Sequence, residues 1–181
     1  LAGARAVVTG GSGAIGAAIC RLLVGQGARV WSLDRDAPAE SIPGVRTLVT
    51  DVRSRASIVE AAAVIAGDGP VDVLVNSHGL QIRAGAMDCT DEALAEILDV
   101  NVGGCWRTCQ VFGATMIEQK HGRIITIASL ASFIGLHEVA AYTASKAALS
   151  GWTRARQAEG GGTGMRGMGV VPGGADSGPG A

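Results

Sequence analysis

The sequence predicts an α/β protein of a single domain, with a doubly wound parallel sheet between two layers of helices (three layers, α/β/α). Short runs rich in β-branched residues alternate with longer segments whose apolar residues recur at helical spacing. This alternation is typical of parallel strands joined by crossover helices. Hydrophobic residues fill 48% of the 181 positions, enough for one core. Sheets of this kind bind their ligands at the carboxyl ends of the strands.

The N-terminal half carries four predicted strands and two predicted helices. Strands are expected over residues 5–9, 29–33, 45–50 and 71–75. The fourth is apolar enough to be buried on both faces, as central parallel strands are. Helices are expected over residues 14–26 and 54–66, where apolar side chains recur every three to four positions.

The C-terminal half continues the same alternation. A long helix is expected over residues 91–120, a strand over 123–128 and a helix over 142–159. A stub of a sixth strand is expected over 168–171, just before Pro172-Gly173. Gly167 and Gly169 should weaken that strand, because glycine adds no side chain to the packing of a sheet.

The composition of the chain changes at residue 160. Residues 1–159 are expected to form the domain that carries the site. Residues 160–181 contain ten glycines in 22 positions (160, 161, 162, 164, 167, 169, 173, 174, 178 and 180). This segment is interpreted as a flexible tail, the end of a truncated chain or an unreliable stretch of sequence, and the three interpretations stay open.

Charge, hydropathy and cysteine usage exclude several classes of protein. Fifteen basic and sixteen acidic residues give a net charge of −1, which lacks the basic surface that a nucleic-acid binder needs. No apolar run approaches the roughly 20 residues of a membrane span, and residues 1–6 do not resemble a signal peptide. The four cysteines form no Cys-x-x-Cys pair and indicate reduced thiols. A cytoplasmic protein is expected.

The turn Thr9–Gly16 is a candidate phosphate-binding element. Glycines let the backbone turn sharply and approach a pyrophosphate, while the following helix offers unpaired N–H groups. The candidate cofactor-binding residues in this turn are Gly10, Ser12, Gly13, Ile15 and Gly16. An ordinary strand–helix turn is the alternative, and the strand before it and the amphipathic helix after it favour the nucleotide.

Asp34, about twenty residues further on, bears on the choice of cofactor. A carboxylate at the end of the second strand can accept hydrogen bonds from both hydroxyls of an adenosine ribose and would repel a 2′-phosphate. NAD is therefore predicted over NADP. Arg35 weakens this preference because a guanidinium can pair with that phosphate, and Asp34 as a simple turn residue remains an alternative.

A candidate catalytic pair lies on the last predicted helix. Tyr142 and Lys146 are four residues apart and project from one face. A nearby ammonium stabilises a phenolate, so such a pair can move a proton while a nicotinamide carries the hydride. Ser129 closes the fifth strand, where its hydroxyl can bond the reacting oxygen. On spacing alone, an exposed pair on the helix would be the better interpretation.

Together these segments resemble the short-chain dehydrogenase/reductase family, whose fold is the Rossmann type. The matching segments, in the family's order and approximate spacing, are Thr9–Gly16, Asn76–Gly79, Asn101, Ser129, Tyr142–Lys146 and Pro172-Gly173. The resemblance therefore covers nearly the whole chain.

The resemblance implies a role for each catalytic candidate. Tyr142 would be the general acid/base, Lys146 would support it and hold the nicotinamide ribose, and Ser129 would orient the substrate oxygen. Asn101 would position a water for proton relay; a helix kink or a satisfied polar residue is the alternative for this asparagine.

The resemblance also implies further cofactor contacts. Asp51 and Val52 would contact the adenine ring, and Ser177 falls where the family carries a threonine that touches the nicotinamide amide. Asn76, Gly79, Pro172 and Gly173, together with Tyr142 and Lys146 of the catalytic pair, complete the predicted cofactor set. His78 replaces a small residue of the family's Asn-Asn-Ala-Gly pattern and is interpreted as a packed histidine beside the cofactor.

One loop narrows the substrate. Residues 79–83, followed by Met87-Asp88, resemble the loop of sugar-acid members such as gluconate 5-dehydrogenases and 2-deoxygluconate 3-dehydrogenases. Arg83 could clamp a carboxylate there together with Ser129 and Tyr142 at the reacting centre; a solvated loop cation is the alternative. His137 and Glu138, between Ser129 and Tyr142, are further candidates for the pocket wall.

The predicted function is hydride transfer between a nicotinamide cofactor and a secondary alcohol or its ketone, with a sugar acid or polyol as the expected substrate. The alternatives are a 3-oxoacyl carrier-protein reductase and a non-catalytic nucleotide-binding regulator. No metal site is expected, since Cys105 and Cys109 lack nearby histidines in the sequence. By resemblance, the helices over 91–120 and 142–159 would form a homodimer or homotetramer.

Overall fold

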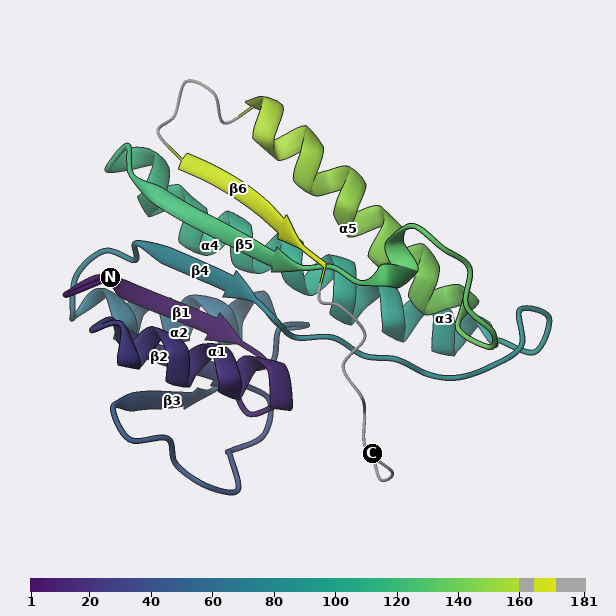
Figure 1. The fold of residues 1–181 in the computed structure, drawn as a ribbon, viewed down its shortest axis with the longest axis horizontal. Coiled ribbons are helices and arrows are strands. Elements are labelled where there is room, and N and C mark those ends of the chain that lie inside the picture. The colour runs from purple at the N-terminus through teal and green to yellow at the C-terminus, as the bar shows by residue number, and fades with distance from the viewer. Residues whose placement is uncertain (160–164, 172–181) are drawn as a thin grey trace.

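The computed structural model describes residues 1–159 and 165–171, and it contains the predicted parallel sheet (Figure 1). Six strands pair in the order β3-β2-β1-β4-β5-β6, all parallel. Their bounds are Arg5–Thr9 (β1), Arg29–Asp34 (β2), Val45–Val49 (β3), Val73–Asn76 (β4), Gly122–Ile127 (β5) and Met165–Val170 (β6). This strand order confirms the doubly wound fold.

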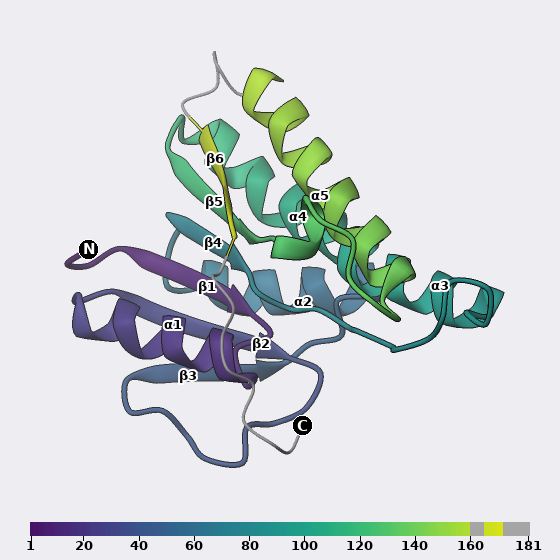
Figure 2. The ribbon, with the colours of Figure 1, turned by 45° about the vertical axis from the view of Figure 1, so that its right-hand side comes forward.

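Helices cover both faces of the sheet. Helix α1 (Ala14–Gly25) packs on one face, and α2 (Arg55–Ala66), α4 (Gly104–Glu118) and α5 (Ala140–Glu159) pack on the other (Figures 1 and 2). Successive strand residues alternate between two buried clusters, because side chains of a strand point to opposite faces. Val7 and Leu74 belong to the cluster under α2 and α4, while Val8 and Val75 belong to the cluster under α1.

The predicted helix over 91–120 is divided in two by a wider turn. Helix α3 (Asp91–Leu98) begins at Thr90, whose side chain accepts a hydrogen bond from the Ala93 N–H at 3.2 Å. One π-helical turn (Asp99–Gly103) then separates α3 from α4. Such turns are common at functional sites, and this one places Asn101 fully inside the protein.

Strand β6 is longer than the predicted stub over 168–171. It pairs with β5 from Gly122 opposite Met165 to Ile127 opposite Val170. Gly167 has a packing reason: a Cβ at this position would lie 2.7 Å from a guanidinium nitrogen of Arg156, which is buried beneath the strand. This close contact explains the glycine at position 167. That the two glycines weaken the strand stays a prediction.

The ends of the central strands place the site. Thr9 at the end of β1 lies opposite Asn76 at the end of β4, and Asn76 lies opposite Thr126 of β5. The chain reverses its direction across the sheet between β1 and β4, which is where open α/β sheets bind ligands. In residues 1–159 and 165–171, no helix is long and apolar enough to cross a membrane.

Candidate functional site

The turn after β1 has a backbone that only small residues permit. Gly10 adopts a left-handed conformation with φ of +67°, and a Cβ there would lie 2.7 Å from the backbone N and Cα of His78. A Cβ on Gly16 would overlap the carbonyl oxygen of Gly10. Gly13 precedes α1 without a side-chain cap, so the first N–H groups of the helix stay available to an anion.

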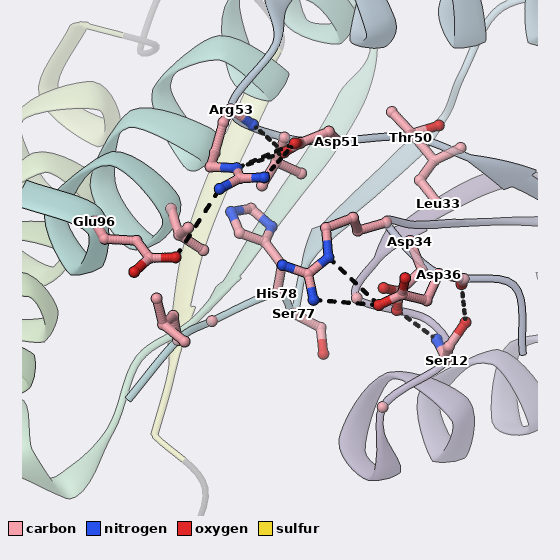
Figure 3. Close-up of a pocket in the computed structure, with 17 residues that line it drawn as sticks. Ser12, Leu33, Asp34, Asp36, Thr50, Asp51, Arg53, Ser77, His78 and Glu96 are labelled. Carbon is pink, nitrogen blue, oxygen red and sulfur yellow. Dashed lines mark hydrogen bonds and ion pairs between the residues drawn. The ribbon is translucent and has the colours of Figure 1, made fainter. Parts of the chain in front are cut away.

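A pocket with a volume of about 420 Å³ opens beside this turn (Figure 3). Nucleotide and cofactor sites fall in this range of volume. Predicted cofactor residues that line it are Gly10, Ser12, Gly13, Asp34, Arg35, Asp51, Val52 and Gly79. Ser129 and Tyr142 are not among the residues that line it.

Two other predicted cofactor residues lie beside the pocket rather than in its wall. Ile15 begins α1 and is 45% exposed. Asn76 is buried behind the pocket, where its Oδ1 accepts a hydrogen bond from the Thr108 hydroxyl at 2.7 Å. Its side chain therefore ties β4 to α4.

Asp34 lies at the end of β2 and faces the glycine-rich turn. Its Oδ2 accepts a hydrogen bond from the Ser12 N–H at 2.9 Å (Figure 3). The neighbouring Arg35 forms an exposed ion pair with Asp36, with 3.3 Å between its nitrogen and the carboxylate oxygen. The carboxylate is thereby fixed at the pocket wall, while the guanidinium is held by another acid.

Asp51 forms the opposite side of the pocket. It accepts bonds from the backbone N–H and from the guanidinium of Arg53, the latter at 2.7 Å. The hydrogen bond from the Arg53 side chain lowers the pKa of the Asp51 carboxyl. Arg53 also approaches Glu96 at 4.0 Å, which joins this edge of the pocket to α3 (Figure 3).

His78 is buried under the loop that follows β4. Its Nδ1 lies 2.6 Å from the Thr9 hydroxyl and its Nε2 lies 3.7 Å from the Cys105 sulfur. A Cβ on Gly104 would lie 2.7 Å from that Nε2, so glycine at 104 makes room for the ring. Burial, and then the charge of Lys146, lowers the pKa of His78 to about 4. His78 is thus a neutral, packed histidine, as the sequence suggested.

Asn101 holds the same loop from the other side. Its Oδ1 accepts a bond from the Leu80 N–H at 2.7 Å, and its Nδ2 donates to the Leu80 carbonyl and the Ser145 hydroxyl, each at 2.9 Å. The alternative of a satisfied polar residue at a helix irregularity describes this side chain well. The expected role toward a relay water stays a prediction.

The catalytic candidates come together where β5 meets α5. Lys146 is buried, and its Nζ donates a hydrogen bond to the Ile127 carbonyl at 2.9 Å. The same nitrogen lies 5.6 Å from the centre of the Tyr142 ring. Burial lowers the pKa of this ammonium group. A Cβ on Gly79 would lie 3.6 Å from Nζ, so the ammonium lies directly behind the loop that lines the pocket.

Ser129 follows the same strand and begins a short 3₁₀ turn (Leu130–Ser132). Its hydroxyl accepts a bond from the Ala131 N–H at 3.2 Å. Ser132, which the sequence analysis did not single out, donates to the Lys146 carbonyl at 3.0 Å and so ties this turn to α5. The Ser-x-x-Ser spacing, typical of a capping box, was the available signal.

Arg83 and Glu138 form an ion pair beside the first turn of α5, outside the wall of the pocket. The Arg83 guanidinium and a Glu138 carboxylate oxygen are 3.4 Å apart. Their loops also pair through the backbone, with the Ala84 N–H donating to the Glu138 carbonyl at 2.9 Å. The predicted clamp residue Arg83 is therefore paired with Glu138, which stands four positions before Tyr142 in the sequence. Pro172, Gly173 and Ser177 lie outside the described residues.

A nicotinamide dinucleotide fits the residues that surround the pocket. The turn offers a glycine cradle and the first N–H groups of a helix. The Ser77 hydroxyl, in the pocket wall, is buried without a hydrogen-bond partner among the described residues, and so is able to bond a ligand. No group of three or more histidine, cysteine or acidic side chains in that part of the chain is placed to hold a metal ion.

Comparison with known proteins identifies the family. The family model for short chain dehydrogenases matches residues 4–179. Galactitol 2-dehydrogenase (L-tagatose-forming) of Cereibacter sphaeroides is 33% identical over 96% of this chain and 72% of its own length. Gluconate 5-dehydrogenase of Gluconobacter oxydans is 31% identical, with the same two coverages. The chain belongs to the short-chain dehydrogenase family.

A solved structure agrees with this assignment. A Beutenbergia cavernae protein, assigned as an NAD(P)-dependent gluconate 5-dehydrogenase and holding NADP at low occupancy, superposes with a TM-score of 0.89. It is 36% identical, and the match covers 95% of this chain and 72% of that one. The family match shows that this chain is an oxidoreductase, and its fold is the one that binds nicotinamide cofactors in this family.

Neutral, buried His78 predicts a stability that falls with acid. Between its unfolded pKa of about 6.5 and its folded pKa of about 4, the unfolded chain binds a proton that the folded chain does not. Stability should therefore decrease as pH falls through this window, by about 3 kcal/mol in all. Urea denaturation at pH 7, 5.5 and 4.5 measures this slope.

The matched control is His137→Asn, which removes a histidine that is 88% exposed. It should keep the slope of the natural protein, whereas His78→Asn should flatten it. Equal slopes for the natural protein and His78→Asn would contradict the assignment of His78 as neutral and buried.

Proposed function

We propose that this protein oxidises a secondary alcohol of a polyol or sugar acid with a nicotinamide cofactor, or reduces the matching ketone. The observation that carries the proposal is the buried Lys146 ammonium, held by the Ile127 carbonyl at 2.9 Å. It lies one helical turn from Tyr142 and directly behind the loop residue Gly79. A buried ammonium beside a phenol, at the edge of a nucleotide pocket, is suited to proton transfer coupled to hydride transfer.

The residues divide the chemistry between them. The bound nicotinamide supplies the acceptor or donor of the hydride. The Tyr142 phenolate accepts the proton of the alcohol and becomes a neutral phenol, and Lys146 stabilises the phenolate before this transfer. Ser129 donates a hydrogen bond to the reacting oxygen and keeps it in line with the phenol.

Asn101 acts in this proposal as a positioning residue. It bonds both backbone groups of Leu80 and the hydroxyl of Ser145, which in turn donates to the Tyr142 carbonyl at 2.7 Å. One side chain thus links the cofactor loop to the first turn of α5. A displacement of about 1 Å between these elements would lower the reaction rate, because the phenol and the substrate must be correctly oriented.

Relatives support the substrate class. Dehydrogenases of galactitol and gluconate match almost the whole chain, and both act on polyhydroxylated open chains. Arg83, in the loop after β4, is proposed to contact the end of the substrate that is remote from the reacting carbon. These observations support a polyol or sugar acid over the alternative of an acyl group on a carrier protein.

NAD is the proposed cofactor, with NADP as the alternative. Asp34, fixed by Ser12 at the pocket wall, is placed to accept the ribose hydroxyls and to repel a 2′-phosphate. Arg35 is engaged by Asp36, which weakens its attraction for that phosphate. The NADP bound in the Beutenbergia cavernae relative favours NADP as the cofactor.

A cytoplasmic location and a homodimer or homotetramer are part of the same proposal. Four free cysteines, three of them buried, support a reducing compartment. Trp106 of α4 is 47% exposed and lies 5.7 Å from Trp152 of α5, ring centre to ring centre. An exposed tryptophan on α4, packed against the half-buried Trp152 of α5, supports these two helices as the subunit contact.

Tyr142→Phe tests the acid/base assignment. Removal of the phenolic oxygen should reduce turnover of NAD with galactitol or D-gluconate by at least ~10³-fold, because the proposed general base is lost. Absorbance at 340 nm measures turnover, and NADH fluorescence should show cofactor binding within about threefold of the natural protein. Turnover that survives the substitution would contradict the assignment; a natural protein that binds NADH without turnover would favour the non-catalytic alternative.

Asp34→Ala tests the cofactor preference. Loss of the carboxylate removes hydrogen bonds to the ribose and the repulsion of a 2′-phosphate. The ratio of NADP to NAD dissociation constants should therefore fall about tenfold. Titration by protein fluorescence measures both constants, with Glu40→Ala, an exposed acid that does not line the pocket, as the control. An unchanged ratio in Asp34→Ala would remove its proposed role.

A further inference from the structure

Two loops that the sequence keeps far apart meet beside the first turn of α5, the turn that carries Tyr142. One follows β4 and the other leads into α5 (Figure 1). Ala84 and Val139 form a parallel bridge between them, supported by the hydrogen bond from the Ala84 N–H to the Glu138 carbonyl. Val139 is buried and its carbonyl accepts the Thr143 N–H at 2.8 Å, so the bridge is continuous with the first turn of α5.

Glu138 is held in an unusual backbone conformation at this bridge. Its φ of +59° lies in the left-handed region, which non-glycine residues rarely adopt. Such conformations persist where the surrounding structure fixes them, and they concentrate at functional sites. Here the conformation directs the carboxylate toward Arg83 at 3.4 Å, and toward His137 at 3.7 Å.

Arg83 and Glu138 carry opposite charges, and each lies within reach of the other. Arg83 is the cation that the loop after β4 presents, and Glu138 neutralises it from the opposite loop. An anionic substrate that approaches Arg83 must displace the Glu138 carboxylate and then remain close to it. An uncharged hydroxyl end of a substrate meets no such repulsion, and it can bond both the guanidinium and the carboxylate.

We propose that Glu138 makes this site selective for uncharged polyols over sugar acids, because it occupies the guanidinium that would otherwise bind a carboxylate. The inference rests on the proposed oxidation of polyols and sugar acids and narrows its substrate class. Arg83 and Glu138 together are the specificity-determining pair. Removal of the glutamate charge frees Arg83 for an anion and should shift the preference toward sugar acids.

The test compares two substrates that differ in one group. D-Glucitol and D-gluconate share their carbon chain and stereochemistry at carbons 2 to 5, but one ends in a hydroxymethyl group and the other in a carboxylate. The ratio of kcat/KM for D-glucitol to that for D-gluconate is measured with NAD at 340 nm. Glu138→Gln should lower this ratio about fivefold, the size expected for a solvent-exposed charge at this distance.

Two variants separate charge selectivity from a loss of structure. Arg83→Gln combined with Glu138→Gln should lose the gain for D-gluconate, because no guanidinium remains to bind it. Glu60→Gln removes an exposed acid of α2 and should leave the ratio unchanged. The effect in Glu138→Gln should also shrink at high ionic strength, a response that a purely structural change would not give.

Binding supplies a readout that does not depend on turnover. Saturation-transfer NMR with the NADH-loaded protein gives dissociation constants for the same two compounds. A shift toward D-gluconate binding in Glu138→Gln without any turnover would overturn the proposed oxidation and leave the charge selectivity standing. An unchanged ratio, or no binding of either compound to any variant, would overturn the selectivity itself.

Discussion

The hydrogen bond from Lys146 to the Ile127 carbonyl links the sheet, the last helix and the chemistry. A buried ammonium needs a partner, since an isolated charge in the interior is costly. The carbonyl at the end of β5 supplies that partner at 2.9 Å and so fixes how α5 lies against the sheet. Ser132 bonds the Lys146 carbonyl from the turn that Ser129 begins. The turn that Ser129 begins and the helix that carries Tyr142 and Lys146 are therefore joined by one local set of contacts.

The cofactor side depends on a second buried contact. Thr9 ends β1, and its hydroxyl meets the His78 ring at 2.6 Å, while the backbone of His78 lies against Gly10. The glycine-rich turn and the loop after β4 are thereby packed on each other. Asn101 fixes the next part of that loop through both backbone groups of Leu80. Nucleotide pocket and catalytic region thus share a loop held at both ends.

The glycine-rich turn and the Tyr142–Lys146 pair could be predicted from the sequence because each depends on a local pattern of residues. Gly10 is required by its backbone conformation and Gly16 by the close approach of the Gly10 carbonyl. Tyr142 and Lys146 share a helix face because they are four residues apart. Contacts between distant segments leave no such pattern. Nothing near Arg83 indicates that Glu138 will pair with it, and the room for Arg156 that explains Gly167 in β6 appears only when α5 is packed on the strand. The sequence likewise predicts one helix over residues 91–120, because the π-helical turn Asp99–Gly103 continues the helical backbone without a break.

The most direct test of the central claim follows the hydride itself. The protein is incubated with NAD and a polyol, galactitol or D-glucitol, whose carbon-bound hydrogens are all deuterium, and the reduced cofactor is analysed by mass spectrometry. The arrangement of Tyr142, Lys146 and the pocket predicts one deuterium in each NADH formed, and none formed by Tyr142→Phe. Reduced cofactor without deuterium, or equal labelling by the variant, would contradict hydride transfer at this site.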